Sequence, residues 1–203
     1  MARQQPPSTR AAKVAGAQKR TRSGPGGGFS LIWVALALVM ALIVGSVGFA
    51  IWQRPTLEGV QTYKDLGRDH VGEAVAYEQE PPVGGDHNAA IWDCGVYDEP
   101  IPPYHAVHSL EHGAVWLTYQ PDLAPDQVET LRGLAGEEFM LLSPDPDQDS
   151  PVVATAWGKQ LQLDTADDPR IPLFIRDYRQ GPDTPEPGAA CTGGTTVDLV
   201  SGG

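Results

Sequence analysis

All five histidines of the chain lie between positions 70 and 112, and none occurs elsewhere in its 203 residues. Imidazole is the commonest metal ligand in proteins and suits both zinc and copper. On a helix, positions 105, 108 and 112 share one narrow face, and side chains three or four residues apart can bind one ion together. The pattern therefore predicts a transition-metal site drawn from His70, His87, His105, His108 and His112.

Two other residue types near the histidines fit such a site. Carboxylates orient ligating imidazoles through hydrogen bonds, and Asp86, Asp93 and Glu111 are close by in the sequence. Met140 is the only methionine outside the N-terminus and the long apolar run, and its thioether is a soft ligand suited to Cu(I). We therefore include Met140 as an additional ligand.

Residues 108–112 also match H-x-x-E-H, the pattern of one class of zinc peptidases, in which Glu111 would be the general base. Glu137 or Glu138 would then supply the third ligand. Against this interpretation, Gly113 is expected to stop the helix at once, and the chain is much smaller than the enzymes that carry the motif. A third hypothesis is a non-catalytic interaction domain, in which the histidines brace loops through hydrogen bonds.

The segment that carries the histidines is rich in turn residues, whereas the second half of the chain has regular patterns. Gly and Pro recur from residue 60 to residue 105, so only short extended pieces such as Glu73–Tyr77 fit there. The fold class is α+β, a small and mostly antiparallel sheet with two or three helices, preceded by one transmembrane helix. Besides the histidine helix, we predict strands at 114–119, 139–143, 152–157 and 160–163, and helices at 126–135 and 171–179.

One uncharged apolar run is long enough to cross a bilayer core of roughly 30 Å as a helix. It is also too long for a typical signal peptide. The residues before it include six basic and no acidic side chains, so the positive-inside rule places them in the cytoplasm and the rest of the chain outside. We predict a single-pass membrane protein with a disordered basic tail (1–28), a transmembrane helix (29–52), an extracytoplasmic domain (53–190) and a flexible tail (191–203).

The predicted outer domain is strongly acidic. All 26 carboxylates lie after residue 28, against eight Lys and Arg, which gives this part a formal charge near -18. The phosphates of DNA or RNA would be repelled over most of such a surface. The charge therefore excludes nucleic acid as a partner, and the lipid bilayer is the partner that the sequence indicates.

Cys94 and Cys191 are the only cysteines, and both lie on the side that we predict to be oxidising. An even pair in such a compartment is most simply a disulfide. Two thiolate metal ligands are the alternative, but neither cysteine has a second cysteine two residues away, as most structural zinc sites do. We therefore predict a disulfide between Cys94 and Cys191.

Several separated pieces of the chain resemble one protein family. The block His-Ser-Leu-Glu-His-Gly at 108–113 runs into an apolar strand, and upstream stand His70-Val71 and a Gly-x-His triplet that ends at His87. Together these pieces are similar to the signature of a bacterial family of domains of unknown function, number 3105, over about residues 60–190. The resemblance implies a single-span or secreted protein and no particular activity. The remaining matching pieces are Tyr77, Pro81-Pro82, Gly95-Val96-Tyr97 and Thr155-Ala156-Trp157-Gly158, and the chain departs from the family at Gly84-Gly85-Asp86, where Ser-Gly-Pro is usual.

His105 lies outside that shared signature, so we rank it below the other histidines. The leading hypothesis is an anchored extracytoplasmic domain that binds a transition metal. Copper comes before zinc because an exported, anchored domain is well placed to handle copper. The predicted ligands are His70, His87, His108 and His112, with His105 and Met140 as additional ones.

Overall fold

The structure is a computed structural model that describes residues 28–52 and 56–200. The chain divides into two compact units, residues 1–54 and residues 55–203, and each is described by itself. The basic tail predicted at 1–28 lies outside the described residues except for Gly28.

The first unit contains the helix α1 (Gly28–Trp52), which matches the apolar run of the sequence. At 1.5 Å per residue, its 25 residues extend over about 37 Å, more than the roughly 30 Å of a bilayer core. Within it, Leu31–Ile51 is long and apolar enough to span a membrane, and none of that stretch is buried against other residues. The predicted spanning segment is therefore a helix of sufficient length and apolarity.

The second unit is built on a six-stranded sheet with the order β1-β8-β7-β5-β6-β4. The first four strands in that order pair antiparallel, whereas β6 pairs parallel with both β5 and β4. Together with the helices, this sheet confirms the predicted α+β class. The strands are β1 (Gln61–Thr62), β4 (Gly95–Val96), β5 (Val115–Tyr119), β6 (Met140–Pro144), β7 (Val152–Ala156) and β8 (Lys159–Leu163).

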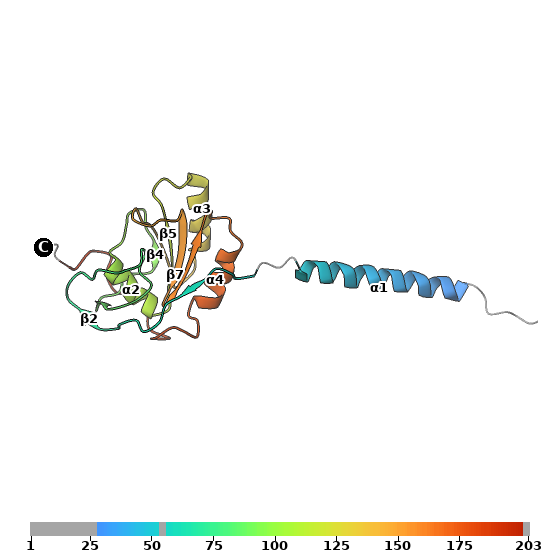
Figure 1. The fold of residues 1–203 in the computed structure, drawn as a ribbon, viewed down its shortest axis with the longest axis horizontal. Coiled ribbons are helices and arrows are strands. Elements are labelled where there is room, and N and C mark those ends of the chain that lie inside the picture. Colours follow the sequence, from blue (N-terminus) through green and yellow to red (C-terminus); the bar gives the residue numbers. More distant parts are fainter. Residues whose placement is uncertain (1–27, 53–55, 201–203) are drawn as a thin grey trace, which may run out of the picture. The chain divides into compact units, whose positions relative to one another are not determined.

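Helices cover both faces of this sheet (Figure 1). On one face, Leu131 and Phe174 from two helices pack against Leu117 of β5. Side chains alternate along a strand, so the neighbouring Trp116 points to the other face and packs against Leu110. The first face is covered by α3 (Pro125–Leu134) and α4 (Arg170–Tyr178), and the second by α2 (Pro103–Glu111).

The regular elements of the second half begin and end within one residue of their predicted bounds. The piece predicted to be extended, Glu73–Tyr77, pairs with no strand in the structure. The Tyr77 hydroxyl instead donates a hydrogen bond to the Asp86 carbonyl at 2.8 Å. The two-residue strands were not predicted, because two residues cannot display a period.

The C-terminal segment extends along the middle of the domain. The Cys94 N–H donates to the Cys191 carbonyl at 2.7 Å, and the Asp93 N–H donates to the Thr195 carbonyl at 2.9 Å. Composition alone predicts a flexible tail over 191–203, whereas its first residues are hydrogen-bonded to the domain. The reason is that Cys191 lies beside Cys94, with the two sulfur atoms at disulfide distance.

The cysteine pair generates a prediction about stability. The two Cα atoms lie 5.4 Å apart across a sequence separation of 97 residues, so a bond between them closes a long loop. Replacing both cysteines with alanine should lower the free energy of unfolding by up to about 4–5 kcal/mol, because the unfolded chain regains the entropy of that loop. Urea unfolding measures the loss, and the reduced wild type is the matched control. Equal stability of oxidised, reduced and alanine forms would contradict the prediction.

Candidate metal centre

Two histidines come from a short parallel ladder of β2 (His70–Val71) and β3 (His87–Asn88), in which His70 lies directly opposite His87. In a parallel pair, opposite residues place their side chains on the same face, so the two imidazoles are neighbours. Their ring centroids lie 5.0 Å apart. The ladder therefore supplies two adjacent ligands from segments 17 positions apart.

The register of this ladder depends on the loops that precede its strands. The Asp86 carboxylate accepts a hydrogen bond from the Asp69 N–H at 3.0 Å. A Cβ atom on Gly67 would come within 2.1 Å of the same Asp86 oxygen, so a larger residue here would displace the Asp86 carboxylate from this hydrogen bond. Gly84 and Gly85 have φ of 144° and 121°, values that favour glycine, and they turn the chain into β3.

The other two side chains come from α2. His108 and Glu111 are three residues apart and therefore share one face of the helix. Leu110, about 200° around the helix from His108, faces the sheet instead. Pro103 occupies the first turn of α2, and Gly113, with φ of 94°, follows its C-terminal end, as predicted. The helix therefore packs its apolar face on the sheet and presents a polar face to the ladder.

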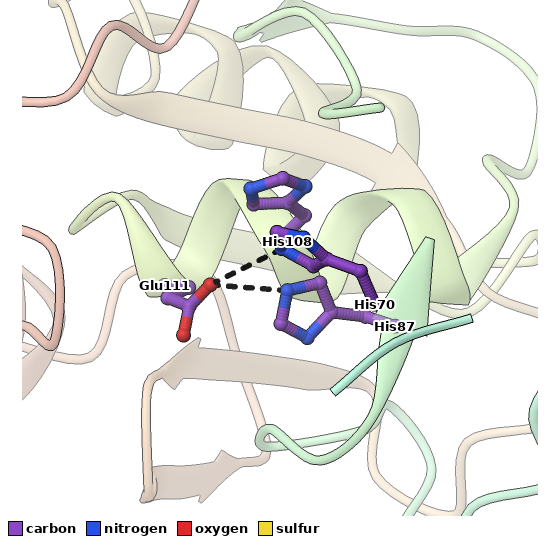
Figure 2. Close-up of side chains that lie close together, drawn as sticks. All are labelled: His70, His87, His108 and Glu111. Atoms are coloured by element: carbon purple, nitrogen blue, oxygen red, sulfur yellow. Dashed lines mark ion pairs between the residues drawn. The ribbon is translucent and has the colours of Figure 1, made fainter. Parts of the chain in front are cut away.

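We call His70, His87, His108 and Glu111 the inner group. One ligand atom from each lies within 4.8 Å of the others, so a single ion can reach all four. Figure 2 shows these side chains converging between α2 and β3. His87 and Glu111 are almost fully buried, whereas the side chain of His70 is 45% exposed. The inner group thus has three buried members and one member at the surface.

The backbone fixes the tautomers of two of these histidines. His87 Nδ1 donates to the Gly85 carbonyl at 2.7 Å, and His108 Nδ1 donates to the Asn88 carbonyl at 2.8 Å. A carbonyl oxygen only accepts, so in each ring Nδ1 carries the hydrogen and Nε2 of the neutral form carries a lone pair. Metal-ligating histidines show this arrangement, in which the second nitrogen is tied to a carbonyl or carboxylate.

Two hydrogen-bond acceptors, one on His87 and one on Glu111, face each other in the inner group. His87 Nε2 lies 3.0 Å from Glu111 Oε2, yet this buried nitrogen has no hydrogen-bond partner among the described residues. Two lone-pair atoms at that distance repel unless a cation lies between or beside them. The other oxygen, Glu111 Oε1, accepts from Arg68 Nε at 2.5 Å, and this hydrogen bond orients the carboxylate. The inner group is therefore arranged to bind positive charge.

Electrostatics keep the central histidine available as a ligand. Burial of the ring, and then the neighbouring imidazole of His87, lower the pKa of His108 to about 4, against a smaller opposing effect of the Asn88 carbonyl. At neutral pH the ring is therefore uncharged. A metal ion would not have to displace a proton from it.

A second set of side chains shares His108, and we call His108, His112 and Glu186 the outer group. His112 Nδ1 donates to the Ala190 carbonyl at 2.6 Å, so its Nε2 also carries a lone pair, 3.5 Å from Glu186 Oε2. Arg68 Nη2 donates to Glu186 Oε1 at 3.4 Å. The rings of His108 and His112 lie 4.6 Å apart, so the two groups adjoin.

Comparison with known proteins assigns the chain to a family. The sequence model of a family described as "Protein of unknown function (DUF3105)" matches residues 70–193, more than half of the chain. The chain belongs to the DUF3105 family. No curated protein and no solved structure matches it. The matched residues of the DUF3105 domain include both groups and both cysteines.

The DUF3105 domain brings together three of the four predicted ligands, and His112 adjoins them in the outer group. The two additional ligands are elsewhere. His105 Nδ1 donates to the Ala90 carbonyl, and Met140 is fully buried in the core between the sheet and the helices α3 and α4. Of the predicted orienting carboxylates, Asp86 holds the ladder loops together, while Asp93 accepts from the Gly194 N–H.

Sequence reasoning missed two residues of the site. Arg68 and Glu186 lie in turn-rich segments without periodicity, and they meet only in the folded DUF3105 domain, where they are paired at 3.4 Å. Glu137, considered as a third peptidase ligand, instead pairs with Arg179. The only sequence signal for Glu186 was its place within the matched family segment, shortly before Cys191.

The lowered pKa of His108 predicts how the metal-free chain responds to acid. Between about pH 6.5 and pH 4 the unfolded chain protonates this histidine while the folded chain does not, so stability falls as the pH drops through that window. In His108→Asn, whose amide can still donate to the Asn88 carbonyl, this part of the fall should be absent. Thermal unfolding with a chelator at several pH values measures it. An equally steep fall in His108→Asn would contradict the prediction.

Proposed function

We propose that the chain is a membrane-tethered domain outside the cytoplasm that binds one divalent transition-metal ion at the inner group, copper ahead of zinc. The observation that carries this proposal is the buried pair of acceptors, His87 Nε2 and Glu111 Oε2, which face each other at 3.0 Å with Arg68 on the far oxygen. A metal ion is a cation that both atoms can bind at once. His70 and His108 complete the set.

The donor set supports a divalent ion. Three imidazole nitrogens and one carboxylate oxygen suit Cu²⁺ and Zn²⁺, whereas Cu⁺ favours the soft sulfur of Met or Cys. Met140 lies in the core, and the two cysteines are paired with each other. For a given set of such ligands, Cu²⁺ binds more tightly than Zn²⁺, which places copper first.

A non-catalytic interaction domain is the alternative from another class. In that case a proton rather than a metal ion would occupy the gap, and a charged His87 would form a buried ion pair with Glu111. Such a pair would brace β3 against α2 without any ligand. Metal uptake at neutral pH separates the two hypotheses.

The outer group gives the peptidase hypothesis one supporting observation, since His108 and His112 of the motif adjoin a downstream glutamate, Glu186. A general base, however, needs a free oxygen that can reach a water molecule. Glu111 is 1% exposed, with one oxygen on Arg68 and the other facing His87. This arrangement favours Glu111 as a metal ligand rather than as a general base.

The metal proposal predicts uptake by the full chain in detergent. Isothermal calorimetry with Cu²⁺ or Zn²⁺ should give one tightly bound ion. His87→Asn and Glu111→Gln should each weaken binding by about tenfold or more, because each removes a ligand. His105→Asn is the matched control, since it changes a buried histidine of the same helix that lies outside both groups.

Two results would contradict the proposal. Uptake by the wild type no greater than that of a chain lacking His70, His87, His108 and His112 would favour the interaction domain. The second result is that the wild type cleaves peptides, while Glu111→Gln retains full metal affinity but cleaves none. In that case the peptidase hypothesis would replace the metal-binding proposal.

The proposed orientation rests on the six basic residues that precede α1 and on the cysteine pair, which is typical of oxidising compartments. Protease added to intact cells should therefore degrade the chain from about residue 56 onward and leave the N-terminal segment. An epitope at each end, followed by immunoblotting, reports which end is lost. Protection of the C-terminal epitope until the cells are lysed would reverse the orientation.

A further inference from the structure

The inner and outer groups meet at one atom. His108 Nδ1 is bound to the Asn88 carbonyl, so Nε2 is the only nitrogen that this ring can offer to either group. One lone pair binds one metal ion at a time. We propose, building on the metal-binding function, that the outer and inner groups are two successive positions of a single ion, which enters at the outer group and moves inward while it stays bound to His108.

Charge and exposure favour the outer group for capture. Glu186 is 44% exposed, whereas Glu111 is 1% exposed, so Glu186 is the only carboxylate of the two groups that meets solvent. Attraction between an exposed carboxylate and an arriving cation raises the rate of encounter. His70 is also exposed, but an imidazole carries no negative charge that would attract a cation. Direct entry past His70 is therefore the competing route.

Arg68 gives the two carboxylates equivalent roles. Its guanidinium contacts Oε1 of Glu111 and Oε1 of Glu186, and each carboxylate turns its Oε2 towards an imidazole of its own group. The Glu186 N–H also donates to the Glu111 carbonyl at 3.1 Å, which fixes the two segments side by side. The positive charge of Arg68 offsets one of the two carboxylate charges, so each position holds its ion less tightly than it would without Arg68.

The transfer exchanges ligands one at a time. In the outer position the ion is bound by Glu186, His112 and His108. As it moves inward, it loses Glu186 and His112 and gains Glu111 and His87. The bond to His108 does not break. The inner group offers four ligands against three and more complete burial, so the ion rests there. Because the ion stays coordinated during the transfer, this path lowers the free-energy barrier both to binding and to release. It does not change the equilibrium affinity of the inner group for the ion.

The test uses the full chain in detergent, with Cu²⁺ alone as the probe. The Trp157 ring lies 6.0 Å from that of His87, so quenching of tryptophan fluorescence in a stopped-flow instrument reports arrival at the inner group. Glu186→Gln and His112→Asn should slow association and dissociation by a similar factor, about tenfold, while the ratio of the two rates changes much less. Equilibrium titration should give one ion per chain.

Asp183→Asn is the matched control, because it removes one carboxylate from the same segment, where Asp183 is exposed and pairs with Lys159. Its rates should match those of the wild type within about twofold. Two ions per chain, unchanged rates in both variants, or lost affinity with unchanged association would each overturn the path. Absence of Cu²⁺ uptake by the wild type would instead overturn the metal-binding function, and the path with it.

Discussion

The site depends on one electrostatic constraint: a buried carboxylate and a buried imidazole lone pair, His87 Nε2 and Glu111 Oε2, face each other at 3.0 Å. The hydrogen bond from His87 Nδ1 to the Gly85 carbonyl places the lone pair on Nε2, and the hydrogen bond from Arg68 Nε orients the carboxylate. Both arrangements belong to the fold itself. Positive charge between the two acceptors is therefore required for a stable site, whether a metal ion or a proton supplies it.

The fold creates this constraint by placing α2 between the six-stranded sheet and the β2–β3 ladder. Its apolar side, with Leu110, packs on the six-stranded sheet, and its polar side meets the β2–β3 ladder. The ladder has only two residues per strand, so its geometry depends on Gly67 and Asp86 in the adjoining loops. The C-terminal segment is held by the cysteine pair, and it brings Glu186 and the Ala190 carbonyl to the end of α2. Distant segments thus position each ligand.

The sequence could predict those parts of this arrangement that show a periodic pattern of residues. The strands and helices of the second half have clear patterns, and helical spacing correctly placed His108 before a glycine stop at Gly113. The histidine cluster and the family signature pointed to His70 and His87, although their two-residue strands have no period to detect. Arg68 contacts Glu111 across 43 positions and Glu186 across 118 positions, and no local pattern encodes such contacts. His105 shares the helical spacing of its neighbours, but its ring turns to the Ala90 carbonyl.

X-ray absorption spectroscopy of the copper-loaded full chain shows which atoms are bound to the ion. We expect three imidazole nitrogens and one carboxylate oxygen at about 2 Å, with one nitrogen lost in His87→Asn. A spectrum unchanged by His87→Asn, or one with fewer than three imidazoles, would show that the ion does not lie between the facing acceptors.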